Sequence, residues 1–281
     1  MNDVTNARPA GGDPAREMWS TRVARYARDG APQTRRFAAA LLDLTAPRDG
    51  ETVLDIATGT GVVAVAAAQR VGPAGRVVAT DFIAEWAPYV QATAAEAGVD
   101  NVTFEVMSAE ALALPDAAFD VVLCQFGLMF VPDKLLALRE MRRVLRPGGR
   151  LGLTVWSVPE RVGIFLISGI VGAALPPEPG PPPLSPLSLG APGLVEGLVA
   201  EAGFRDVRMQ PHTLGVEIAS AETEWERWAG DTDNPMVARF AALPEAERAA
   251  LRARVISEME ARREGEVIVL TSEALLVTAA C

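Results

Sequence analysis

The chain has 281 residues, of which 49% are hydrophobic and 22% are charged, and its formal net charge is −10. This length suits one large domain or a domain with an appended cap, and an acidic chain without a basic stripe argues against nucleic-acid binding. Two cysteines and one histidine cannot form a zinc or iron–sulfur ligand set, so no metal site is predicted, although magnesium held by carboxylates stays open.

The first residues and the longest apolar run indicate where in the cell the protein is expected. Residues 1–13 are polar and contain glycine and proline, which predicts a disordered start and not a signal peptide. The longest apolar run, residues 162–175, is shorter than the roughly 20 residues of a membrane span. We therefore expect a cytoplasmic protein with no membrane span. A homodimer is compatible with the sequence, which does not indicate the oligomeric state.

Strands and helices alternate through the first half of the chain. Residues 14–44 read as two helices that separate at Gly30–Pro32. Strands are then predicted at residues 52–57, 76–81, 102–106, 119–124 and 150–156, and helices at 61–71, 85–97 and 133–146. The segment Pro147–Gly149 is predicted to end the last of these helices. This alternation predicts a mostly parallel sheet with helices on both faces.

The second half of the chain does not continue this regular alternation of strands and helices. It reads as an apolar helix at residues 162–175, a proline-rich loop at 176–192, a helix at 193–202, a strand at 204–218, a helical stretch at 221–264 and a last strand at 266–280. The prediction is an α/β fold with a doubly wound, mostly parallel, seven-stranded sheet, N-terminal helices and a helical cap. Residues 51–157 would form its core, 158–192 an apolar lid and loop, and 193–281 the C-terminal helix and strands, with the cap inserted at about 221–264.

A glycine-rich turn follows the first predicted strand. In "VLDIATGTG" the strand carries Asp55 near its end, and Gly59 and Gly61 open a G-x-G-x-x-[GA] pattern before a helix. In this strand–turn–helix context the pattern indicates a nucleotide-type ligand. Asp81 ends the second strand, 20 residues after Gly61, where an acid can bind ribose hydroxyls. A nicotinamide cofactor fits these features as well.

Asp55 separates the two cofactor classes. A dinucleotide places its pyrophosphate over the following helix N-terminus, and a nearby carboxylate would repel it. S-adenosylmethionine (SAM) carries ribose and adenine but an ammonium in place of phosphates, so it suits Asp55. The alternative is that Asp55 only accepts backbone N–H groups of the turn.

The same segments resemble a known family. "VLDIATGTG" is similar to motif I of the class I SAM-dependent methyltransferases, and "VVATDFIAEW" to their acidic second-strand end. "FDVVLCQFGLMFVPD" and "REMRRVLRPGGRL" resemble segments of the ubiquinone/menaquinone-biosynthesis methyltransferase group. The resemblance covers about residues 15–157. It implies a Rossmann-like methyltransferase fold with SAM as cofactor and does not specify the acceptor.

The resemblance also implies roles for individual residues. The backbone around Ala57, Thr58, Gly59 and Gly61 would hold the methionine part of SAM. Asp81 would bind the ribose and Phe82 would pack on the adenine. Ser108, Ala109 and Glu110 are expected near the adenine edge. Relatives often carry Asp at the position of Ser108. Cys124 and Gln125 would line the methyl region, with a buried core position as the alternative for Cys124. "MWSTRVARYA" resembles a segment that closes over SAM, which makes Tyr26 a cofactor-binding candidate and residues 14–50 a lid, with core packing as the alternative.

The acceptor site is expected after residue 157. The apolar segment at 162–175 and the helical cap favour a hydrophobic small molecule, such as a quinol, polyketide or terpenoid, methylated at oxygen or carbon. His212 is the only histidine and the candidate base, although a lone strand histidine is more often structural. The alternatives are a SAM-fold enzyme with other chemistry, such as a cyclase, a NAD(P)-dependent oxidoreductase, and a non-catalytic SAM-binding protein.

Overall fold

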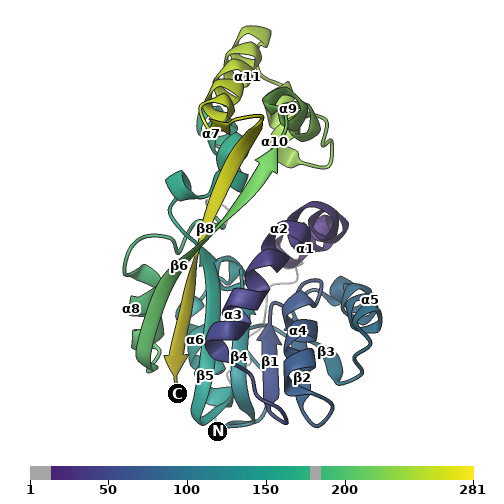
Figure 1. Ribbon diagram of the computed structural model, residues 1–281, viewed down its shortest axis with the longest axis vertical. Coiled ribbons are helices and arrows are strands. Elements are labelled where there is room, and N and C mark those ends of the chain that lie inside the picture. Colours follow the sequence, from purple (N-terminus) through teal and green to yellow (C-terminus); the bar gives the residue numbers. More distant parts are fainter. Residues whose placement is uncertain (1–13, 178–184) are drawn as a thin grey trace, which may run out of the picture.

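The computed structural model describes residues 14–177 and 185–281, so the predicted start at residues 1–13 and part of the proline-rich loop lie outside it. Within these ranges the strands form one sheet in the order β3-β2-β1-β4-β5-β8-β6, with the short β7 paired to β8 (Figure 1). Neighbours from β3 to β5 are parallel, and β8 runs antiparallel to β5 and β6. The predicted α/β fold with a mostly parallel, seven-stranded sheet is confirmed, and β7 is an addition.

The elements have the following bounds. The strands are β1 Thr52–Ile56, β2 Arg76–Asp81, β3 Val102–Val106, β4 Phe119–Gln125, β5 Leu145–Trp156, β6 Arg205–Ile218, β7 Arg263–Glu264 and β8 Val267–Ala280. The α-helices are α1 Pro14–Arg25, α2 Ala31–Thr34, α3 Ala38–Thr45, α4 Val62–Val71, α5 Ala87–Ala97, α6 Lys134–Val144, α7 Leu166–Ala174, α8 Leu194–Glu201, α9 Ala221–Ala229, α10 Pro235–Ala241 and α11 Glu245–Glu260.

Two predicted boundaries are wrong. The chain does not break at Gly30–Pro32, because residues 26–30 form a π-helical turn and α2 continues it. Pro32 lies in the first turn of α2, where the missing N–H costs little. The second error is at Pro147–Gly149, which lies inside β5. The helix before it ends at Val144, since Leu145 turns extended and pairs with Phe119, and both side chains are buried.

Each face of the sheet carries its own hydrophobic layer, because successive strand residues point to opposite faces. Val53 and Val121 pack with α3 and α4 on one face. Leu54 and Val122 pack with α6 and α8 on the other. The inner parallel strands β1, β2 and β4 are apolar through their middle, so their polar residues fall near the strand ends, which is where ligand sites of such sheets form.

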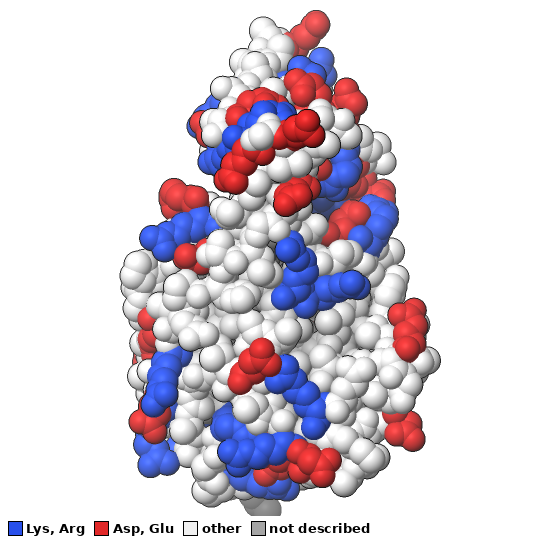
Figure 2. Space-filling view, in the orientation of Figure 1, with Lys and Arg blue, Asp and Glu red and all other residues white. Residues whose placement is uncertain are grey.

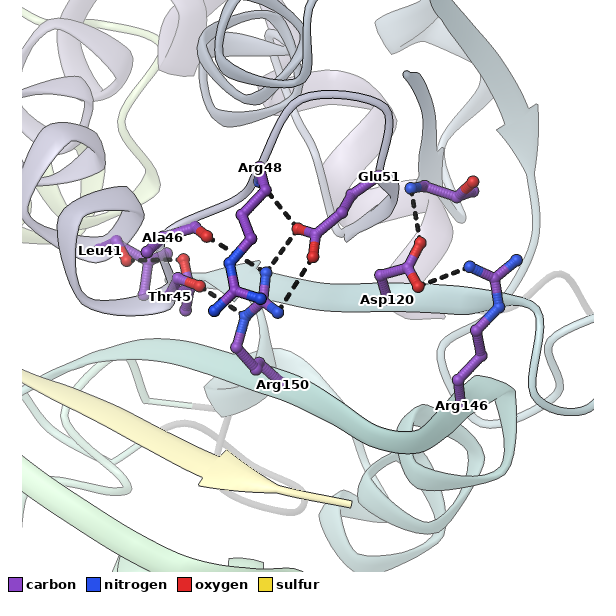
Figure 3. Close-up of polar contacts among 9 residues, drawn as sticks. Leu41, Thr45, Ala46, Arg48, Glu51, Asp120, Arg146 and Arg150 are labelled. Carbon is purple, nitrogen blue, oxygen red and sulfur yellow. Dashed lines mark hydrogen bonds and ion pairs between the residues drawn. The ribbon is translucent and has the colours of Figure 1, made fainter. Parts of the chain in front are cut away.

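A polar network fixes the amino edge of the sheet (Figure 3). The Arg150 guanidinium donates through Nε to the Thr45 carbonyl at 2.7 Å and contacts Glu51 Oε2 at 2.5 Å through Nη2. Beside it, Asp120 accepts the backbone N–H of Thr52 at 2.8 Å. These contacts join α3, β1, β4 and β5 and anchor the N-terminal helices to the sheet.

The cap has a separate small core. β8 pairs with β5 only from Ala274 to Ala280, and its preceding residues pair with β6 as a two-stranded ribbon that extends beyond the sheet (Figure 1). Side chains from α7, α9, α10 and α11, including Val171, Trp225 and Val255, bury one another at the end of this ribbon. The ribbon therefore carries the cap above the carboxyl edge of the parallel strands.

The described surface carries charges of both signs. On the face shown in Figure 2, acidic and basic side chains are interspersed. Among the described helices, none is both long enough and apolar enough to cross a membrane. Residues 14–177 and 185–281 contain no group of three or more His, Cys, Asp or Glu side chains that could hold a metal ion.

Candidate functional site

A cavity lies at the carboxyl edge of the sheet, between the end of β1 and the N-terminal helices. The turn after β1 and the start of α4 form one wall, and the N-terminal helices form the other. Its lining residues are Tyr26, Thr34, Arg35, Asp55, Ala57, Thr58, Gly59, Thr60, Val62, Val63 and Gln125. Six of them, Tyr26, Asp55, Ala57, Thr58, Gly59 and Gln125, are predicted cofactor residues that the fold brings together.

The glycine turn has the backbone that the sequence pattern predicts. Ala57, Gly59 and Gly61 have positive φ values of 55°, 52° and 80°, a region that favours glycine. A Cβ on Gly61 would lie 3.1 Å from the Val90 backbone, so α5 also packs closely there. The turn is tied to β2 by a hydrogen bond from the Thr58 N–H to the Thr80 carbonyl at 3.0 Å. The turn therefore exposes backbone atoms to the cavity, and its packing on α5 and its hydrogen bond to β2 fix the position of these atoms.

Two buried carboxylates flank the turn. Asp55 accepts from the Thr58 hydroxyl at 2.6 Å, and burial raises its pKa to about 7. Asp81 accepts the N–H of Gly59 at 3.1 Å and of Ile83 at 3.1 Å, and burial raises its pKa to about 6. Repulsion by Asp81 also raises the pKa of Asp55. A cationic ligand would relieve this burial cost by favouring the ionised forms.

The N-terminal helices cover the cavity. The Tyr26 hydroxyl bonds the Thr34 hydroxyl at 3.0 Å, and burial raises the pKa of Tyr26. Gln125 donates from Nε2 to the Thr34 carbonyl at 3.1 Å. Its Oε1 atom is buried and has no hydrogen-bond partner among the described residues. A buried acceptor without a donor is costly, so a ligand that donates to Gln125 would be favoured here.

The remaining predicted cofactor residues lie outside the cavity lining. Gly61 is buried behind the turn. Phe82 follows Asp81 and packs beside Val23 and Trp86, while its carbonyl accepts from Arg16. Ser108 accepts the backbone N–H of Glu110 at 3.2 Å in the turn after β3. Met107 donates to the Asp81 carbonyl at 2.9 Å, so this turn, which also contains Ala109, lies next to Asp81.

Cys124 is fully buried at the end of β4, and burial raises the pKa of its thiol to about 12. A Cβ on Gly127 would lie 3.0 Å from its sulfur, so the thiol sits in close packing. The side chain is an inert core group.

A second cavity lies on the other side of the segment that begins at Gln33. It is lined by Gln33, Arg36, Phe37, Trp156, Ile164, Leu214, Val216 and Ser272. Phe37 packs edge-on against Phe126 and Trp156, at ring-centroid distances of 5.4 and 5.3 Å. Since Phe126 directly follows Gln125, which lines the first cavity, this aromatic cluster lies beside both cavities.

His212 lies at the edge of this aromatic cluster. Its ring contacts Phe37 at a centroid distance of 5.8 Å, and it pairs with Ala274 in β8, which also pairs with Trp156. The predicted base therefore lies level with the carboxyl edge of the parallel strands, although it lines neither cavity. Its catalytic role stays a prediction.

Sequence reasoning missed two groups of residues. Arg35 and Arg36 line the first and second cavities respectively. The sequence shows them only as an adjacent basic pair in "PQTRRF", which does not indicate that they face the cavities. Phe126, which adopts a positive φ of 56° directly after Gln125, had no local signal either, because its partners Phe37 and Trp156 come from distant segments.

Comparison with known proteins places these features in a family. Residues 32–165 match the model of the ubiE/COQ5 methyltransferase family. The chain is 34% identical over 269 residues to nocamycin O-methyltransferase of Saccharothrix syringae, which covers 90% of this chain and 93% of the relative. It is 45% identical over 119 residues to the ubiquinone/menaquinone biosynthesis C-methyltransferase UbiE of Hahella chejuensis. That match covers 42% of this chain and 48% of the relative, so it is confined to about half of each.

Among solved structures, the [4+2]-cyclase SpnF shares the fold. The TM-score is 0.54 at 22% sequence identity, covering 87% of this chain and 80% of the cyclase chain. Likeness at this identity shows the fold alone and does not choose between methyl transfer and cyclisation.

Proposed function

Since the chain belongs to the ubiE/COQ5 methyltransferase family and is a SAM-dependent methyltransferase, we propose that its acceptor is a hydrophobic small molecule, methylated at oxygen or carbon. The observation that supports this most is the largely aromatic and aliphatic lining of the second cavity, a hollow of about 10 Å³ that an acceptor would have to widen. It lies beside the cofactor cavity and below the cap. Small-molecule sites are typically apolar and contain a few polar groups.

The donor and acceptor groups of the first cavity fit SAM. We propose that Asp55 binds the ammonium and that Arg35 binds the carboxylate of the methionine part. Asp81 uses one lone pair on each oxygen for backbone N–H groups, which leaves acceptor capacity for ribose hydroxyls. The unpartnered Oε1 of Gln125 would accept from the bound molecule. We assign Phe82 and the turn from Ser108 to Glu110 to the adenine side.

The chain's own residues supply alignment and exclusion of water. When bound, SAM supplies a sulfonium-activated methyl group. Tyr26 and Thr34 close the cavity from the N-terminal side, which removes water from the reacting atoms. The cluster of Phe37, Phe126 and Trp156 would hold the acceptor against the methyl, and such alignment alone lowers the barrier substantially. His212 is proposed as the base for an acceptor that arrives protonated.

Transfer of labelled methyl from SAM tests the proposal. The purified protein would be incubated with methyl-labelled SAM and a panel of lipophilic phenols, enols and carboxylic acids, beside hydrophilic amines and RNA. We expect label only in lipophilic acceptors, and a loss of that label in Asp81→Asn. Label in the hydrophilic compounds or RNA would contradict the proposed acceptor class. Conversion of a lipophilic substrate without label would favour the cyclase-like alternative.

A further inference from the structure

Residues 14–45 form one continuous helical segment, although Gly30 and Pro32 lie inside it. The hydrogen bond that closes the turn after α1 runs from the Ala31 N–H to the Tyr26 carbonyl, five residues back, so this turn is π-helical. In an uninterrupted α-helix the ring of Pro32 would clash with the carbonyl four residues earlier. The wider turn lets α2 begin at Ala31 and places Pro32 in its first turn, where a proline is tolerated. Pro32 therefore accounts for the π-helical turn.

The Tyr26 side chain leaves this turn in an unusual direction. Long side chains of a helix normally point toward its N-terminus. The Tyr26 ring instead lies over Gly30, and its hydroxyl reaches the Thr34 hydroxyl at 3.0 Å, so the side chain runs toward the C-terminus. A Cβ on Gly30 would lie 2.6 Å from Cδ2 and 2.8 Å from Cε2 of the ring, which is closer than such atoms can approach. The ring can take this position only because residue 30 is glycine.

In this position the Tyr26 ring lies over the glycine turn that follows β1. Tyr26 lines the first cavity, and its Cε1 atom lies 4.0 Å from the position that a Cβ on Gly59 would take. Trp19 and Trp86 contact the ring edge-on, at centroid distances of 6.0 and 5.8 Å. A ligand bound on the glycine turn would therefore have this ring as its cover.

We propose that Gly30 and Pro32 are positioning residues for the cofactor, because together they build the π-helical turn that aims Tyr26 at the first cavity. Neither residue lines the cavity. Pro32 sets the backbone of the turn, and Gly30 leaves room for the ring. Relaxing the turn to an α-helix would rotate Tyr26 by roughly 100°, the angle between successive α-helical residues, and withdraw its ring. This inference rests on the proposed function, which places SAM in the first cavity.

Calorimetric titration with S-adenosylhomocysteine (SAH), the product that SAM leaves after methyl transfer, tests the role of Gly30. Gly30→Ala should weaken SAH binding by roughly tenfold or more, because the added Cβ displaces the Tyr26 ring. Gly197→Ala in α8 is the matched control, since a Cβ on this helical glycine meets no atom within 4 Å. This control should bind SAH like the wild type.

The same substitution in a Tyr26→Ala background separates positioning from a general effect on the helix. Tyr26→Ala alone should weaken SAH binding. Adding Gly30→Ala to it should then change nothing further, since no ring remains to be displaced. The inference is overturned if Gly30→Ala binds SAH like the wild type, or if it weakens binding equally with and without the Tyr26 ring.

Pro32→Ala tests the turn itself and adds no atom near the ring. Pro32 is exposed, so the variant loses no buried contact, but the cause of the π-helical turn is gone. SAH binding should weaken by roughly threefold or more. Pro235→Ala, at an exposed proline in the first turn of α10, is the control and should bind like the wild type.

The outcomes separate this inference from the proposed function. An unchanged SAH affinity in Pro32→Ala would contradict the role of the turn, also where Gly30→Ala did not fold. Wild-type binding of SAH without a loss in these variants contradicts the inference alone. Failure of the wild-type protein to bind SAH would contradict the proposed function and, with it, this inference.

Discussion

Asp55 and Asp81 make the cofactor cavity sensitive to pH. Burial raises their pKa values to about 7 and about 6 from 3.8. The folded values lie above the unfolded ones, so the native protein holds more protons than the unfolded chain between about pH 4 and 7. The stability of the ligand-free protein should therefore fall as the pH rises through this window. A ligand with an ammonium group binds the ionised forms, so its affinity should rise.

We predict that SAH affinity increases by roughly tenfold or more between pH 5.5 and 7.5. Titration calorimetry across this range measures it. Asp55→Asn should flatten the profile because one of the two titrating carboxylates is gone. The exposed Asp100→Asn is the matched control and should follow the wild type. A wild-type affinity that does not change with pH would contradict the proposed roles of the two acids.

The two acids were predictable from the sequence, whereas Arg35 and Phe126 were not. Asp55, Gly59 and Asp81 lie within one strand–turn–helix–strand unit, where local spacing fixes their relative positions. Arg35 and Phe126 reach the site only through tertiary packing of the N-terminal helices on β4. A single sequence contains no direct record of that packing.

The network around Arg150 anchors α3 to the sheet. Replacing Arg150 by Met removes donors to two backbone carbonyls, those of Thr45 and Ala46, and leaves Glu51 without its ion-pair partner. We expect a loss of about 2 kcal/mol in the free energy of unfolding, measured by urea titration. Arg227→Met, which breaks an exposed pair with Glu224, should cost much less. Equal losses in the two variants would show that the Arg150 network contributes no more to the free energy of unfolding than an exposed ion pair does.

The helix break predicted at Gly30–Pro32 is wrong because local sequence signals do not include tertiary packing. Glycine and proline usually mark a break, and here the chain stays helical through both. A Cβ on Gly30 would lie 2.6 Å from Cδ2 of Tyr26, so the glycine makes room for the ring that covers the cavity. Most other elements were predictable, because their hydrophobic patterns and end signals agree with the packing.

The described residues form a core and a cap, and the N-terminal helices contact both. On the core side, Trp19 packs edge-on against Phe130 at 5.0 Å. On the cap side, Arg25 in α1 pairs with Asp231 after α9 at 2.6 Å. We propose that residues 14–50 act as the lid of the cofactor cavity and that the cap at about 221–264 holds this lid closed.

If the cap holds the lid closed, breaking the ion pair should speed cofactor exchange. We predict that Asp231→Asn increases the SAH dissociation rate roughly fivefold, which corresponds to about 1 kcal/mol. Stopped-flow tryptophan fluorescence measures this rate. Asp233→Asn, in the same loop and exposed, is the control. An unchanged dissociation rate in Asp231→Asn would mean that the cap does not restrain the lid.

The most direct test of the account is calorimetric titration of the full chain with SAH, with NAD(H) and NADP(H) as comparison ligands. We predict micromolar SAH binding, no measurable nicotinamide binding, and an SAH affinity at least tenfold lower (about 1.4 kcal/mol) in Asp81→Ala. Failure of the wild-type protein to bind SAH, or a preference for a nicotinamide cofactor, would contradict the assignment of the cavity between Asp55 and Arg35.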